Sequence, residues 1–151
     1  MITIGIDPGK SGAIAWTDEH GRVCVEKMPE TLADLWDLIH SLNFNVDSEK
    51  YTNHIKAYIE QVHSMPGQGV SSSFKFGNGF GHLEMALTAA GIPFERVPPQ
   101  KWQKSMGCMT KGDKNVSKRR AQELFPAIKC THAVSDALLI CEYGRRANIG
   151  F

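Results

Sequence analysis

The chain has 151 residues, of which 42% are hydrophobic and 22% are charged, and its formal net charge is +1. This length suits one domain with a sizeable core, and we expect residues 1–151 to form a single unit. Four widely spaced cysteines without a C-x-x-C pair exclude a zinc ribbon and a thioredoxin-like motif. Because no apolar run approaches about 18 residues and the first residues suggest a strand rather than a secretion signal, we expect a cytoplasmic protein that enters no membrane.

Charge is unevenly distributed along the chain. Residues 1–60 hold 5 Lys and Arg against 10 Asp and Glu, whereas residues 61–151 hold 12 against 6. The second part is therefore the candidate anion-binding region, with basic residues at Lys101, Lys104, Lys111, Lys114, Lys118, Arg119, Arg120 and Lys129. Such a run is typical either of a solvated helix face or of a nucleic-acid surface.

The sequence opens with an alternating run that predicts a strand ending on an acid. Isoleucines occupy every second position of residues 2–7, so one face of the strand is buried and Asp7 lies on the other. Pro8-Gly9 ends this strand, and the apolar run at 12–16 forms the second strand of a hairpin with Asp7 at its mouth. Residues 22–28 alternate again and predict a third antiparallel strand.

The middle of the chain predicts a helix, a fourth strand and a long loop. Leucine and isoleucine recur at helical spacing over residues 32–42, and we expect this stripe to lie in the core. Residues 55–62 predict a strand that carries Glu60 near its end. From 64 to 81, glycine, serine and phenylalanine dominate, which predicts a flexible loop.

The last part of the chain predicts one more strand and several helices. In order, these are helix 83–90, edge strand 92–97 broken by Pro98-Pro99, helix 115–125 and helix 131–146. His132 and Asp136 are four residues apart, so they share one face near the start of the final helix. The whole order indicates an α/β fold with a five-stranded mixed sheet and helices on both faces.

Three acids have positions that suit a metal site. Asp7, Glu60 and Asp136 lie at strand ends or a helix start, where rigid elements could bring them to one place. Mg²⁺ prefers carboxylate oxygens and keeps positions for water and phosphate. Two ions roughly 4 Å apart would activate a water and neutralise a phosphodiester, with His132 as a fourth ligand or proton-transfer group. Three unrelated surface acids are the alternative interpretation.

Five segments, colinear over nearly the whole chain, resemble RuvC-type Holliday junction resolvases, especially the phage-type members. They are Ile-Gly-Ile-Asp-Pro-Gly-Lys-Ser-Gly at 4–12, Ile-Glu-Gln-Val at 59–62, Val97 to Trp102, Lys114 to Pro126 and His132 to Ile140. The resemblance implies an RNase H-like fold and a homodimeric, Mg²⁺- or Mn²⁺-dependent endonuclease that nicks paired strands at four-way junctions in DNA recombination and repair. It places Asp7, Glu60 and Asp136 on the family's metal-binding positions. It also implies a protein of the bacterial cytoplasm, with a phage gene as one source.

Two features depart from the family pattern. Its last two metal-site residues are commonly three apart rather than four, which leaves the role of His132 open. No aromatic residue follows Glu60 directly to probe the junction centre, so Phe74 or Phe76 is the candidate substitute, with core packing as the alternative.

The basic residues of the second part of the chain fit this resemblance. We expect phosphate contacts from Lys101, Lys104, Lys111, Lys114 and Lys118.

The same residues bear on several other functions. A Walker loop needs four residues between its glycines, and Gly5 and Gly9 enclose three. An actin-like or sugar-kinase site needs two such domains, so we expect no nucleotide cofactor. A non-catalytic module that binds branched DNA would lack part of the acid set. A broader structure-selective nuclease of forks, flaps and branched phage DNA stays open.

Overall fold

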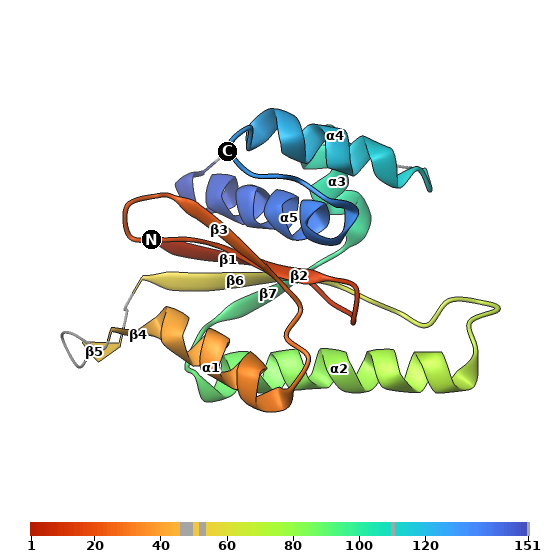
Figure 1. Ribbon diagram of the computed structural model, residues 1–151, viewed down its shortest axis with the longest axis horizontal. Coiled ribbons are helices and arrows are strands. Elements are labelled where there is room, and N and C mark those ends of the chain that lie inside the picture. Colours follow the sequence, from red (N-terminus) through yellow and green to blue (C-terminus); the bar gives the residue numbers. More distant parts are fainter. Residues whose placement is uncertain (46–49, 52–53, 110, 151) are drawn as a thin grey trace.

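Alternating isoleucines build the central strand of a five-stranded sheet in the computed structural model, which describes residues 1–45, 50–51, 54–109 and 111–150. The sheet order is β3-β2-β1-β6-β7 (Figure 1). Its strands are β1 (Ile2–Asp7), β2 (Ala13–Thr17), β3 (Val23–Lys27), β6 (Ile55–Glu60) and β7 (Phe94–Val97). A separate two-stranded sheet contains β4 (Phe44–Asn45) and β5 (Lys50–Tyr51).

Helices cover both faces of the sheet (Figure 1). On one face lie α3 (Pro99–Met106), α4 (Lys114–Leu124) and α5 (His132–Ile149), and on the other lie α1 (Leu32–Asn43) and α2 (Val70–Ala89). The predicted α/β class, with a five-stranded mixed sheet between helices, is confirmed. In the described part of the chain, no helix combines the length and apolar character needed to cross a bilayer.

Strand pairing places two of the predicted site residues at the same edge of the sheet. β1 pairs antiparallel with β2 and parallel with β6, and Ile6 lies opposite Ile59. Parallel strands end at the same side, so Asp7 and Glu60 follow on neighbouring strands. β6 also pairs parallel with β7, and Glu60 lies opposite Val97.

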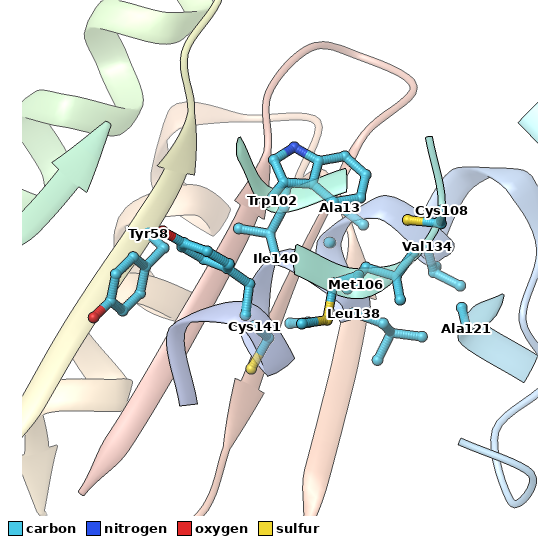
Figure 2. Close-up of a cluster of buried hydrophobic side chains, with 14 of the residues drawn as sticks. Ala13, Tyr58, Trp102, Met106, Cys108, Ala121, Val134, Leu138, Ile140 and Cys141 are labelled. Atoms are coloured by element: carbon cyan, nitrogen blue, oxygen red, sulfur yellow. The ribbon is translucent and has the colours of Figure 1, made fainter. Parts of the chain in front are cut away.

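The helix that carries Asp136 passes unusually close to the sheet. A Cβ atom added at Gly5 of β1 would collide with the backbone of Cys141, and one at Gly144 would collide with the ring of Tyr58. Glycine at these two positions therefore allows α5 to approach β1 and β6 closely. The buried side chains between α5, α3 and the sheet include Trp102, Met106 and Leu138 (Figure 2).

A second core lies between the sheet and the helices α1 and α2. Its buried members are Ile2, Ile4, Ile6, Ile14, Leu35, Ile39, Ile55, Ala57, Ile59, Leu83, Leu87, Ala90 and Ile92. The α1 stripe enters this core less completely than the sequence predicts, because Leu32 is 61% exposed and Trp36 is 38% exposed. Asp7, by contrast, lies on the opposite face of β1 from the isoleucines, as their alternation predicts.

The predicted loop at 64–81 is wrong from residue 70 onward. Helix α2 begins at Val70, with Gly69 as its N-cap, so residues 70–81 are helical. Gly77, Gly79 and Gly81 have open space where a Cβ atom would lie, so no close contact requires glycine at these positions. Helix α3 is a further element that the sequence prediction missed, because Pro98-Pro99 was interpreted as a break. Proline is in fact favoured in the first helical turn, where its missing N–H would have no intrahelical partner.

Candidate active site

Three acids from separate elements interact at one edge of the sheet. Asp7 ends β1, Glu60 ends β6 and Asp136 lies in the second turn of α5, and all three side chains are partly buried. The pKa of Asp7 is raised to about 8, first by burial and then by the negative charges of Asp136 and Glu60. The structure therefore brings the three predicted acids together as one electrostatic group.

Each acid has a different set of compensating partners. Burial raises the pKa of Glu60 to about 6 against the hydrogen bond from the Trp102 indole, whose Nε1 atom lies 2.7 Å from Oε2. Burial also raises the pKa of Asp136, while a hydrogen bond from Ser117 and the charges of Lys114 and His132 lower it. The raised pKa values show that these partners leave the negative charge of the group incompletely compensated.

The donor set fits hard divalent cations. Carboxylate oxygens are the ligands that Mg²⁺ prefers, and a nearby cation would favour the charged forms that burial and, for Asp7 and Glu60, neighbouring carboxylates disfavour. Within the described residues, no three His, Cys, Asp or Glu side chains are gathered tightly enough to hold one ion. Mg²⁺ is commonly bound by one or two carboxylates together with water and substrate phosphates, which is compatible with acids spread around a wider site.

His132 lies beside the acids but on the outside of the molecule. It is the first residue of α5, exposed to solvent, and its charge lowers the pKa of Asp136 one turn further along. His132 is thus exposed, whereas the three acids are partly buried.

The five predicted DNA-binding lysines are all exposed but differ in what lies around them. Lys114 begins α4 and faces the acids, since its charge lowers the pKa of both Asp7 and Asp136. Lys118 follows one turn later on α4 and is exposed, as are Lys104 and Lys111. Lys101 is placed differently: its Nζ atom lies 3.4 Å from Glu95 Oε1 and 6.0 Å from the centre of the Tyr143 ring.

The position of Lys101 separates it from the acid end of α5. Tyr143 follows Asp136 by seven residues, which is about 10 Å along a helix axis. The ion pair with Glu95 draws the ammonium group toward this more distant turn. Lys114, by contrast, lies close enough to the acids for its charge to lower the pKa of Asp7 and of Asp136.

The structure distinguishes the two phenylalanines proposed for the junction centre. Phe74 is 75% exposed on the first half of α2. The Phe76 ring instead packs against the turn that follows Asp7, where a Cβ atom added at Gly9 would lie 2.8 Å from the ring. Gly9 also has a φ of 104°, so both its conformation and its contact require glycine. Phe76 fixes α2 against the site turn, and Phe74 is the side chain available to a ligand.

Several neighbours of the acids were not identified from the sequence. Trp102 and Ser117 each lie within a segment that carries the RuvC resemblance, and both donate hydrogen bonds to site acids. Cys108 is a third neighbour, because burial followed by the charge of Asp136 raises the pKa of its thiol to about 11. A large aromatic residue inside a basic stretch was the available signal for Trp102, and the sequence held no comparable signal for the other two.

Comparison with known proteins supports the fold. The sequence matches no protein-family model and no curated protein. The structure of Thermus thermophilus RuvC is similar at 17% sequence identity, with a TM-score of 0.61 over 99% of this chain and 97% of that chain. T. thermophilus RuvC in complex with a Holliday junction substrate is similar at 18% identity, with a TM-score of 0.59 over 99% and 96% of the two chains.

The sheet order and its helical layers define the RNase H-like class of α/β proteins. Within this class, the fold of the chain is that of RuvC. The resemblance predicted from five short sequence segments is thus confirmed at the level of the fold.

Proposed function

We propose that the protein is a metal-dependent endonuclease that resolves four-way DNA junctions by paired nicks. The observation that carries this proposal is the convergence of Asp7, Glu60 and Asp136 at one edge of a RuvC-type fold. Partly buried acids that repel one another destabilise a protein unless a ligand compensates them, and such groups concentrate at functional sites. The similar T. thermophilus RuvC has been seen with a Holliday junction, which supports branched DNA as the partner.

The residues of the chain would divide the work between metal binding and DNA positioning. Asp7, Glu60 and Asp136, assisted by His132, would hold the cations. When bound, Mg²⁺ or Mn²⁺ supplies an activated water and neutralises charge on the phosphoryl group. Lys114 offsets part of the acid charge, and the exposed lysines 104, 111 and 118 would hold phosphates of the duplex arms. A homodimer of single-domain subunits would match the two-fold symmetry of the substrate.

Cleavage of defined DNA structures tests this function. The purified protein would be incubated with an immobile four-way junction, a fork and a linear duplex, each with Mg²⁺, Mn²⁺ or EDTA. We expect symmetric nicks in the junction alone, and only with a divalent ion. Equal cutting of forks and flaps would replace junction resolution with a broader structure-selective nuclease. Tight junction binding without any cleavage would indicate a non-catalytic module.

Charge reversal at Lys118 is expected to weaken junction binding and its dependence on salt. Each phosphate contact contributes about 0.9 to the slope of log K against log salt, so Lys118→Glu should reduce the slope by about 1. Fluorescence anisotropy with a labelled junction in EDTA measures both quantities between low and moderate salt. Arg22→Glu is the matched control, because Arg22 is exposed beside the β2–β3 turn, at the opposite end of the sheet. An unchanged slope for Lys118→Glu would contradict a phosphate contact there.

Truncation of Phe74 is expected to weaken binding to the junction more than binding to duplex. Stacking of an aromatic side chain on an exposed base contributes about 1–3 kcal/mol, so Phe74→Ala should lower junction affinity roughly 5-fold or more. A 2-aminopurine at the junction centre reports stacking through its fluorescence. Met85→Ala is the control, because Met85 is 62% exposed on the same helix. Equal losses for the two variants, or an equal loss on duplex, would exclude a specific role for Phe74.

A further inference from the structure

We propose that Trp102 is a positioning residue that holds the Glu60 carboxylate in its cation-binding orientation. This inference rests on the proposed metal-dependent function and extends it to a residue that does not touch the substrate. Its basis is one hydrogen bond between a fully buried side chain and a partly buried site acid.

The geometry of this hydrogen bond is strongly constrained. The indole Nε1 atom donates to Glu60 Oε2 at 2.7 Å, and the Trp102 side chain is fully buried. Its ring belongs to the same buried cluster as Ala13 and Met106, between the sheet and α5 (Figure 2). A ring enclosed in this way keeps one rotamer, so its N–H direction is fixed before any ligand arrives.

The backbone reinforces the same contact. Glu60 lies opposite Val97 at the end of the β6–β7 pair, and the Gln61 N–H donates to the Val97 carbonyl at 2.8 Å. Helix α3 starts two residues after Val97, at Pro99, and returns Trp102 to the acid within its first turn. The strand end and the indole therefore hold Glu60 from two directions over a very short stretch of chain.

The choice of partner gives this bond a role beyond core packing. A buried indole N–H needs an acceptor, and a backbone carbonyl would meet that need without involving the site. Here the acceptor is one oxygen of a carboxylate, which has about four lone-pair directions and so keeps others for a cation. In metalloproteins, loss of a partner that orients a ligand typically lowers metal affinity or activity by about 10- to 100-fold.

Metal affinity of Trp102 variants tests the proposal directly. Free Mn²⁺ would be measured by electron paramagnetic resonance during titration of the DNA-free protein, with the metal alone as the probe. We expect Trp102→Phe to bind Mn²⁺ about 10-fold more weakly than wild type. Replacement of the indole by benzothiophene, which keeps the ring shape but lacks the N–H, should give the same loss. Cleavage by both variants should fall mainly in kcat at saturating junction and recover partly at high Mn²⁺.

A core variant separates positioning from general loosening of the protein. Met106 is 1% exposed in the same cluster, so Met106→Ala should lower the unfolding temperature while leaving Mn²⁺ affinity within about 2-fold of wild type. Wild-type affinity in both Trp102 variants would overturn the proposal and leave the nuclease function standing. An equal loss of affinity in Met106→Ala would also overturn it. A wild-type protein that binds no Mn²⁺ would overturn the metal-dependent function and this inference together.

Discussion

Asp7→Asn should lower the rate of junction cleavage by at least about 10³-fold while the protein stays folded. The substitution keeps the shape of the side chain but removes the charge of the acid that interacts with both Glu60 and Asp136. A loss of about 4 kcal/mol of transition-state stabilisation, which is within the range attributed to catalytic cations, corresponds to this factor. Single-turnover cleavage of a labelled four-way junction in Mg²⁺ measures the change.

Junction binding should respond in the opposite direction to cleavage. Asp7→Asn removes a negative charge from a site that we expect to face phosphate, so affinity in EDTA should stay equal or rise. Asp37→Asn is the matched control, because Asp37 is an exposed acid on α1, which covers the face of the sheet opposite to α5 (Figure 1). Normal cleavage by Asp7→Asn would show that the acid group is not the active site, whatever the fold.

The strand positions of the acids follow from local sequence, whereas their meeting does not. Alternating isoleucines place Asp7 at a strand end on the face opposite the core of α1 and α2, and this prediction depends only on strand periodicity. The arrival of Asp136 depends on the path of α5, which passes over β1 where Gly5 leaves room for its backbone. A lone glycine in a strand indicates a close approach without naming the approaching segment. The family resemblance supplied that information.

Helix α2 shows how tertiary contacts override local composition. Residues 70–81 of this helix contain three glycines at alternate positions and three consecutive serines, which favour a loop. The helix is held by contacts that residue spacing does not reveal. Phe76 packs on Gly9, and Glu84 pairs with Arg96 of β7 at 2.6 Å. The Arg96 guanidinium also lies 5.6 Å from the centre of the Phe80 ring.

The partners of charged groups were the least predictable part of the site. Lys101 and Trp102 are adjacent in a segment that the sequence marked as basic, yet Lys101 pairs with Glu95 and Trp102 with Glu60. Adjacent side chains on a helix point in different directions, so helix α3 had to be recognised before these partners could be assigned. Because Pro98-Pro99 was interpreted as a break instead of a helix start, the partners of Lys101 and Trp102 could not be predicted.

The metal-free protein should lose stability as pH rises from about 5 to 8. An unfolded Asp7 has a pKa near 3.8, whereas the folded protein raises it to about 8, so between these values the folded state holds a proton that the unfolded state has lost. Stability is therefore greatest below the unfolded pKa and falls by up to about 1.4 kcal/mol per pH unit until the folded pKa is passed. Glu60, with a folded pKa of about 6, adds to the fall at the lower end of this range.

Urea denaturation at several pH values in EDTA measures this dependence. Asp18, Glu95 and Glu142 have lowered pKa values, so their contributions change below about pH 4.5, outside this range. Asp7→Asn should flatten the dependence of the free energy of unfolding on pH. At pH 8 this free energy should exceed that of wild type by about 2–5 kcal/mol, because the buried charge is gone. Mg²⁺ or Mn²⁺ should stabilise wild type more at pH 8 than at pH 5, because a cation binds the charged form. Parallel curves for wild type and Asp7→Asn would show that the acid is already compensated and needs no cation.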